Sequence, residues 1–594
     1  MAAEGVIVFK LTISRSKNAA SLYVAQSFYD EGIRSSRIVE KLGTEAELRE
    51  KLGGRDPYEW AQEYIDGLNR KVKEAKEQNP DILVKYSPTK LIRKGEQRSF
   101  NGGYLFLQRI YHVLGLDKIC KKIEARHKTT FDLNSILSRL VYSRVIYPSS
   151  KLASYRLSKR FIEQPKFELQ HIYRALGVIA KEIDFIQAEL YKRSSSNLAE
   201  RNTGVLYYDC TNYFFEVEQE DGLKQYGYSK EHRPNPIVQM GLFLDGDGIP
   251  LAFSITEGNQ NEQLTLKPLE QKIIADFGLA KFIVCTDAGL SSLANRKFND
   301  MGERSFITTQ SVKKLKDYLK GWALYSEGWR LAGSEETYDI GGLCRGPGEI
   351  GAIDREAYFD KVFYKERWVN DDGLNQRLVV TFSLKYRNYQ RRIRDGQVAR
   401  AEKLIRSKSV KLKKSHQNDY KRFILKKNVT ASGEEAEETI FSIDKDQIAG
   451  EEIYDGYYAV CTNLEGDVGD IIAINKQRWE IEESFRIMKH EFKARPAFVQ
   501  RDDRIKAHFT TCFIALIVFR YLEKLLGDKH TCCEIIEALR GMDFLEAKGN
   551  GYIPTYTRTD LTDDLHMVSG FRTDYQIVTN TQMKENIKVT KKPK

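Results

Sequence analysis

Two aspartates lie in segments where a carboxylate needs a partner. Asp209 lies inside the apolar segment GVLYYDCTNYFFEV, and Asp287 ends the apolar segment KFIVCTDAG. Aspartate is disfavoured in strands, and a buried carboxylate is costly unless it is paired or bound to a metal. Two such groups on strands of one sheet need a shared cation or proton between them. Capping of a turn is the alternative, and it is stronger for Asp287, which Ala-Gly follows.

Glu482 is the candidate for a third carboxylate because of its place on an expected helix. At about 100° per residue, Glu482 falls about 40° and Lys489 about 20° from Arg478 along the edge of the apolar face. Glu480 and Glu483 are expected to face solvent instead. A simple ion pair between Arg478 and Glu482, four residues apart, is compatible with this arrangement.

The two aspartates fall in a run of alternating strand and helix patterns. Three strands are expected over 204–217, 237–245 and 249–258. A helix over 264–278 and a strand over 281–289 follow, and then a helix over 294–302 and a strand over 304–310. Gly246-Asp247-Gly248 predicts a hairpin turn between the second and third strands. Three antiparallel strands followed by crossover units are typical of a ribonuclease-H-like sheet. We therefore predict an α/β fold with a mixed sheet of that kind as its core.

The rest of the chain surrounds this core. We expect a small α+β domain over 1–90 and a helical domain over 91–200. The core follows in two parts, 201–312 and 454–545, with a large insertion domain over 313–453 between them. A polar tail over 546–594 is expected to be ordered only in part.

Composition indicates a soluble globular protein. Hydrophobic residues make up 41% and charged residues 30% of the 594 residues, as in ordinary globular domains. No export signal precedes the first expected strand. The longest apolar stretch, 509–519, is too short to cross a bilayer and predicts a buried helix. The eight cysteines form no CxxC pair or zinc-site spacing, which favours a reducing cytoplasm.

Positive charge is concentrated in one segment. The net charge is +11, and residues 385–423 alone hold 14 Lys and Arg against 3 Asp and Glu. A basic run with interleaved tyrosines suits a phosphate backbone, and a solvated helix face is the alternative. Within it, Arg391, Arg392 and Arg394 are candidate DNA contacts.

Several motifs together resemble those of bacterial insertion-sequence DDE transposases. Members of that family carry a Tyr-x2-Arg-x3-Glu-x6-Lys (YREK) motif, and NKQRWEIEESFRIMK places Arg478, Glu482 and Lys489 at those spacings, with Asn475 at the tyrosine position. YYDCTNYFF and IVCTDAGLSS are similar to the two Asp motifs of the family. SRVIYPSSKLAS, near 150, and RPAFVQRDDRIKAH, near 500, are also similar to family segments.

The resemblance implies metal-dependent cutting and joining of DNA. Asp209, Asp287 and Glu482 would be the catalytic carboxylates and would hold Mg²⁺, for which Mn²⁺ could substitute, since hard oxygen ligands suit both ions. Two metal ions could activate the attacking oxygen and stabilise the leaving one. Water would free a DNA 3′-hydroxyl, and that hydroxyl would attack a second phosphodiester.

The resemblance also implies partners. These are double-stranded DNA with terminal inverted repeats and target DNA, with a homodimer forming on DNA in the bacterial cytoplasm and no membrane involved. The helical domain would bind DNA ends or mediate dimerisation. Arg478 and Lys489 would hold phosphates, and further candidates for DNA contact are Lys230, His232 and Arg233, for which a polar turn is the alternative. Trp322 or Trp329 could stack on an unpaired base, with core packing as the alternative.

Three other functions fit the sequence less well. A ribonuclease-H-like nuclease without strand transfer would not need the large additional domains. A non-catalytic DNA-binding protein derived from a transposase would be expected to have lost an acidic residue. A glycosidase could use paired carboxylates, but no tryptophan-lined sugar cleft is indicated.

Overall fold

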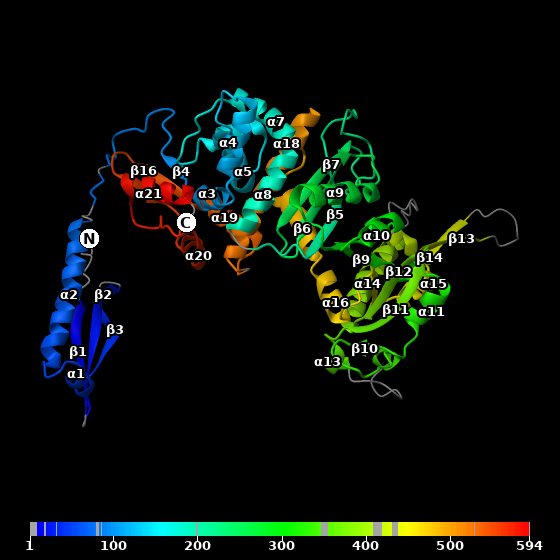
Figure 1. The fold of residues 1–594 in the computed structure, drawn as a ribbon, viewed down its shortest axis with the longest axis horizontal. Coiled ribbons are helices and arrows are strands. Elements are labelled where there is room, and N and C mark those ends of the chain that lie inside the picture. Colours follow the sequence, from blue (N-terminus) through cyan, green and yellow to red (C-terminus); the bar gives the residue numbers. More distant parts are fainter. Residues whose placement is uncertain are drawn as a thin grey trace. The chain divides into compact units, whose positions relative to one another are not determined.

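The computed structural model describes residues 9–16, 19–30, 33–78, 82–84, 86–197, 200–345, 355–407, 419–429, 438–527 and 529–592. Within it the chain forms two compact units, Met1–Lys94 and Gly95–Lys594 (Figure 1).

The first unit is a three-stranded sheet with a long helix beside it. Its elements are β1 (Phe9–Arg15), β2 (Ala20–Asp30), β3 (Ile33–Thr44), α1 (Glu45–Lys51) and α2 (Pro57–Gln78). The strands are antiparallel in the order β1-β2-β3. Asn69 of α2 exchanges two hydrogen bonds with the backbone of Phe9, and Leu22, Leu48 and Ala61 form a small core. This is the kind of α+β unit expected over residues 1–90.

The second unit is built on a nine-stranded mixed sheet in the order β10-β11-β12-β15-β9-β8-β5-β6-β7. Its first five strands in the chain and their helices are β5 (Val205–Phe214), β6 (Ile237–Asp245), β7 (Pro250–Glu257), α9 (Leu266–Phe277), β8 (Ile283–Thr286), α10 (Leu293–Asn299) and β9 (Ser305–Gln310). β5, β6 and β7 are antiparallel neighbours, whereas β8 runs parallel to both β5 and β9. The predicted order of three strands followed by two helix–strand crossovers is confirmed.

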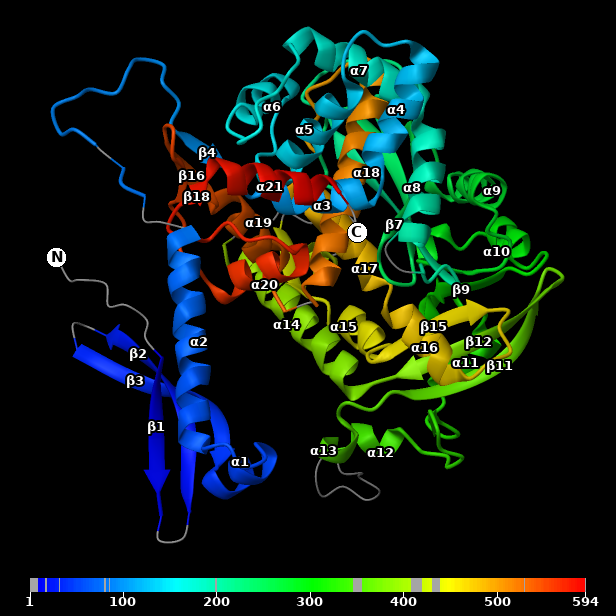
Figure 2. The ribbon, with the colours of Figure 1, turned by 60° about the vertical axis from the view of Figure 1, so that its left-hand side comes forward.

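The region expected as the insertion domain adds three strands to the same sheet and forms a two-stranded sheet of its own. Its elements are α11 (Asp317–Leu324), β10 (Arg330–Leu331), α12 (Gly341–Cys344), α13 (Arg355–Tyr358), β11 (Phe363–Asp371), β12 (Leu374–Phe382), α14 (Leu384–Arg406), β13 (Ile424–Val429), β14 (Glu438–Ile443) and α15 (Lys445–Glu452). β15 (Tyr457–Thr462) pairs with β9 on one side and with β12 on the other (Figure 2). The long strands β11 and β12 therefore continue the core sheet instead of standing apart from it.

A helical layer covers one part of the sheet. It consists of α3 (Tyr104–Val113), α4 (Leu116–His127), α5 (Leu133–Ile146), α6 (Lys151–Ser158), α7 (Leu169–Lys181) and α8 (Ile183–Asn197), preceded by β4 (Ser99–Asn101). The apolar helix α18 (Asp502–Leu525) packs against α3, α5 and α7 and also against β7. α18 thus joins the helical layer and the sheet in one hydrophobic core, and Figure 2 shows this helix among the helices of that layer.

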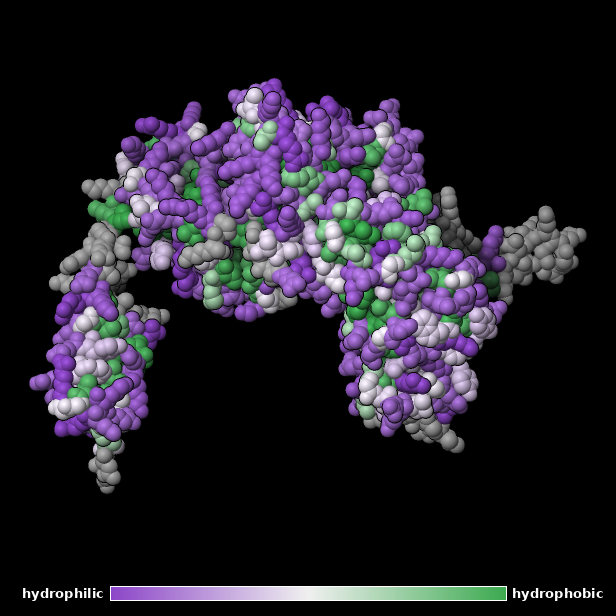
Figure 3. Space-filling view, in the orientation of Figure 1, coloured by the Kyte–Doolittle hydropathy of each residue, from purple (hydrophilic) through white to green (hydrophobic). Residues whose placement is uncertain are grey.

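α18 is, within the described ranges, the one helix long and apolar enough to cross a membrane, and 94% of its apolar window is buried inside the protein. The prediction of a buried helix over residues 509–519 is confirmed by this packing. The face of the second unit in Figure 3 is predominantly hydrophilic.

The carboxyl-terminal segment is folded, which corrects the expectation of a partly ordered tail. α19 (Cys532–Gly541), β16 (Asp543–Ala547), β17 (Gly551–Pro554), α20 (Asp560–Ser569), β18 (Val578–Thr579) and α21 (Asn580–Lys591) follow α18. β16 pairs with β4, and α21 packs on α3. The prediction was wrong because it rested on the polar composition of this segment. The few apolar side chains of the segment are buried by partners more than 400 residues away in the sequence.

Candidate functional site

Asp209 and Asp287 are brought together by the parallel pairing of β5 and β8. This pairing ends with Tyr207 opposite Cys285, two residues before each aspartate, and the two carboxylates interact electrostatically. Neighbouring strands lie about 4.8 Å apart, so the two carboxylates share one edge of the sheet. Asp287 also caps the short helix that follows, because its Oδ1 accepts a 3.1 Å hydrogen bond from the Leu290 N–H. Asp287 therefore both caps the turn that follows it and lies close to Asp209.

Asp209 lies in a buried and strongly charged environment. Burial raises its pKa to about 6, with Lys230 opposing the shift and Asp287 adding to it. Lys230 Nζ lies 3.2 Å from Glu262 Oε1 and donates a 2.5 Å hydrogen bond to the Cys210 carbonyl oxygen. The half-buried ammonium group of Lys230 thus partly balances the charge of Asp209.

Glu482 lies on α17 (Trp479–Arg486) and is oriented differently from the prediction. Its side chain is 62% exposed, and Glu482 Oε1 lies 3.5 Å from Arg478 Nη2. Glu480, expected to face solvent, is only 21% exposed and forms an ion pair with buried Arg520 of α18. Glu483 is also less exposed than Glu482. The predicted placement of the three glutamates around the helix was therefore wrong.

The helix is interrupted, and this explains the error. α16 (Val468–Lys476) ends before Arg478, α17 begins at Trp479, and a π-helical turn, η5 (Ile487–Glu491), follows. Each change of helix type shifts the angular positions of later residues relative to earlier ones. In addition, Arg520 of α18 lies beside α17 on a side that the continuous pattern assigned to solvent, and it pairs with Glu480 there.

Arg478 connects the glutamate to the aspartates. Its guanidinium interacts electrostatically with both Glu482 and Asp209. The turn before it is fixed by Tyr207 of β5, whose hydroxyl donates to the Ile474 carbonyl oxygen at 3.0 Å. Glu482 and Asp209 are therefore linked through this arginine, with Glu482 at the exposed end.

Lys489 lies on the π-helical turn and faces the same region. Its Nζ is 3.7 Å from Glu231 Oε1 and 5.7 Å from the centre of the Tyr213 ring. Burial lowers the pKa of Lys489 to about 8, with Lys230 adding to the shift and Asp209 opposing it. A phosphate placed here would favour the charged form of this lysine.

Three other predicted DNA contacts lie together in the loop before β6. His232 and Arg233 are exposed in the loop before β6, and Arg233 lies 5.1 Å from the Phe214 ring centre. Lys230, from the same loop, is partly buried beside Asp209.

The basic helix α14 requires a correction. Arg392 is exposed, but Arg394 is 5% exposed and donates two hydrogen bonds of 2.7 and 2.6 Å to buried Asp455. Arg391 lies 3.5 Å from the same carboxylate. Arg394 therefore joins α14 to the segment before β15 and is unavailable to DNA. Part of the predicted basic run, 408–418, lies outside the described residues.

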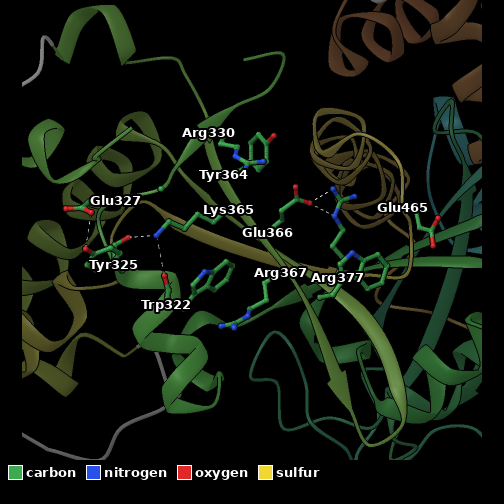
Figure 4. Close-up of a pocket in the computed structure, with 12 residues that line it drawn as sticks. Trp322, Tyr325, Glu327, Arg330, Tyr364, Lys365, Glu366, Arg367, Arg377 and Glu465 are labelled. Carbon is green, nitrogen blue, oxygen red and sulfur yellow. Dashed lines mark hydrogen bonds and ion pairs between the residues drawn. The ribbon is translucent and has the colours of Figure 1, made fainter. Parts of the chain in front are cut away.

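The two candidate tryptophans also differ. Trp329 is fully buried, with its indole N–H donating to the Tyr325 carbonyl oxygen, so core packing is its role. Trp322 lines a cavity of about 770 Å³ beside Lys365 and Arg367 (Figure 4). Arg367 lies 5.8 Å from the Trp322 ring centre. An aromatic ring and cations thus meet in this cavity.

Sequence reasoning did not select Glu262 or Glu231. Glu262 begins the short helical turn after β7 and contacts Lys230. Glu231 stands between two residues that were selected, Lys230 and His232, and contacts Lys489. The sequence feature that marks Glu231 is an acidic residue between basic ones. Such a residue is usual in a polar loop, so this feature alone does not select it.

Comparison with known proteins gives one family. The family described as "Transposase DDE domain" matches residues 213–518, beginning four residues after Asp209 and including Asp287 and Glu482. No curated protein matches the chain. Among solved structures, a piggyBac transposase synaptic complex with hairpin DNA is similar at 8% identity and a TM-score of 0.35, over 83% of this chain and 91% of that one. At that TM-score the likeness carries no argument about fold or function.

Proposed function

The chain belongs to the transposase DDE domain family, and from this premise we propose that it cleaves DNA at the ends of a mobile element and joins those ends to target DNA. The supporting observation is that Asp209 on β5 and Asp287, directly after the neighbouring parallel strand β8, interact electrostatically, and that burial raises the pKa of Asp209 to about 6. A sheet with three antiparallel strands and two parallel crossover strands supports a ribonuclease-H-like core for this activity.

The donor groups at this edge suit a divalent metal. Within the described ranges, no group of three or more His, Cys, Asp or Glu side chains is arranged to hold one. Asp209 and Asp287 nevertheless offer hard oxygen ligands, and the cost of ionising buried Asp209 is one that a cation would offset. Glu482, water and phosphate oxygens would complete the set. Bound Mg²⁺ would activate the attacking oxygen and stabilise the leaving oxygen.

The cationic residues would orient the DNA. Arg478, Lys489 and Lys230 all interact electrostatically with Asp209. Each would bind a phosphate oxygen and hold the cleaved strand so that its 3′-hydroxyl lies in line with the next phosphodiester. Glu231 would hold Lys489 in place until a phosphate takes the position of the Glu231 carboxylate.

Cleavage and joining require two element ends at one time. We therefore propose that the protein acts on double-stranded DNA with terminal inverted repeats, as a homodimer formed on that DNA.

Single substitutions test the proposed carboxylates. Asp209→Ala, Asp287→Ala and Glu482→Ala should each abolish Mg²⁺-dependent cleavage while DNA binding survives, with Glu483→Ala as the matched control that retains most cleavage. Full cleavage by Glu482→Ala together with loss in Glu483→Ala would show that the third carboxylate was misassigned.

A second assay separates the proposed transposase from a nuclease. A pre-cleaved end with a free 3′-hydroxyl should be joined to a target plasmid by the full chain in Mg²⁺. Cleavage of intact ends without any joining would favour a nuclease that lacks strand transfer.

A further inference from the structure

Buried basic side chains gather where two unassigned segments meet. Arg144 and Lys151 belong to the segment SRVIYPSSKLAS, and His508 ends the segment RPAFVQRDDRIKAH. The exposed fractions of Arg144, Lys151 and His508 are 3%, 5% and 4%. Burying basic groups together is costly unless something compensates their charge.

Arg144 and His508 are held by backbone carbonyl groups. Arg144 donates to the carbonyl oxygens of Lys493 at 3.3 Å and Ser149 at 3.1 Å, and His508 Nε2 lies 3.1 Å from the Ala494 carbonyl oxygen. These contacts bring the beginning of α6 beside the segment that directly follows the π-helical turn of Lys489. The Nε–H of Arg144 is buried without an acceptor in the described part of the chain.

Lys151 has no such compensation. It is the first residue of α6, after the capping residue Ser150, and neither a hydrogen bond nor an ion pair of its ammonium group occurs among the described residues. Burial lowers the pKa of Lys151 to about 7, with Arg144 adding to the shift and Cys512 opposing it. Burial also lowers the pKa of His508, and Lys151 and Arg144 add to that shift. No carboxylate contributes to either shift.

We propose that Lys151, with the beginning of α6, is a binding site for a phosphate of the DNA backbone. This inference rests on the proposed function, since it requires DNA beside Lys489. A phosphate would supply the negative charge that the cluster lacks, and the free N–H groups at the beginning of a helix favour anions. Lys493, exposed at the same junction, extends the positive surface from Lys489 toward α6. The helical layer thereby contacts the same DNA as the catalytic edge.

Lys151→Met removes the ammonium group and keeps a similar side-chain volume in a buried place. Its affinity for a short fluorescent duplex of arbitrary sequence should fall about tenfold, as expected for loss of one charge-assisted contact. The slope of log affinity against log salt should decrease by about 0.9. Lys159→Met is the matched control, because it removes an exposed lysine after the other end of the same helix and should change neither quantity.

Equal affinity and equal salt slope for Lys151→Met and the unmodified protein would overturn the proposal. If Lys151→Met does not fold, acetylation of the unmodified full chain decides, with mass spectrometry following each lysine. Duplex DNA should slow acetylation of Lys151 much more than that of Lys159, and an unchanged Lys151 rate would overturn the proposal. Cleavage that still depends on Asp209 and Asp287 would show that the proposed function survives such a result.

Discussion

Replacing Asp209 with asparagine should stabilise the metal-free protein at neutral pH. Burial raises the pKa of this carboxyl from 3.8 to about 6, with Lys230 opposing the shift and Asp287 adding to it. At about 1.4 kcal/mol per pKa unit, ionisation of Asp209 costs the folded state up to about 3 kcal/mol. Asparagine keeps an oxygen that can accept the 2.7 Å hydrogen bond from the Cys210 N–H, so the substitution removes mainly the charge.

The effect should depend on pH in a defined direction. The folded-state pKa is the higher one, so the folded protein binds this proton more tightly, and Asp209 destabilises the fold above about pH 6. That destabilisation is lost as the pH falls through about 6 toward the unfolded value. The gain in Tm of Asp209→Asn should therefore be largest above about pH 7 and disappear near pH 4.

Calorimetry in the presence of a chelator measures this gain. Asp317→Asn is the control, because the side chain of Asp317 is fully exposed. The reasoning is refuted if Asp209→Asn is no more stable than the unmodified protein at neutral pH, or if its gain is the same at every pH.

Three further predictions concern the added strands and the assembly. Arg394→Ala should lower the free energy of unfolding by about 3–5 kcal/mol because Asp455 stays buried without its partner. Arg392→Ala should instead leave the Tm nearly unchanged and reduce the salt slope of DNA binding by about 0.9. Loss of DNA affinity without loss of stability in Arg394→Ala would contradict the structural role of Arg394. If the cavity beside Trp322 accepts an unpaired base, 2-aminopurine next to the cleavage site should change its fluorescence on Trp322→Ala, and an unchanged signal would exclude stacking there. The mass of a cleavage-competent end complex should correspond to two chains and two ends, so a competent complex of one chain and one end would exclude the dimer.

Local patterns in the sequence were sufficient for the core sheet and its two aspartates. Apolar runs, a Gly-Asp-Gly turn and helix periodicity act over a few residues, so the order of strands from β5 to β9 could be predicted without any long-range contact. Asp209 and Asp287 then meet because β5 and β8 are parallel neighbours whose last register pair lies two residues before each aspartate. The apolar composition of α18 likewise predicted a buried helix.

Only the tertiary structure decided which polar side chains are buried. Glu480 is drawn inward by Arg520, forty residues away, and Arg394 by Asp455, sixty-one residues away. The carboxyl-terminal segment is folded because β16 pairs with β4 from the beginning of the second unit. A periodic pattern gives the position of a side chain around its own helix, but the burial and pairing of that side chain depend on which distant element packs there. Packing of the distant element buries apolar surface, and a buried charge then needs a partner from that element to offset its desolvation, which the local sequence does not show.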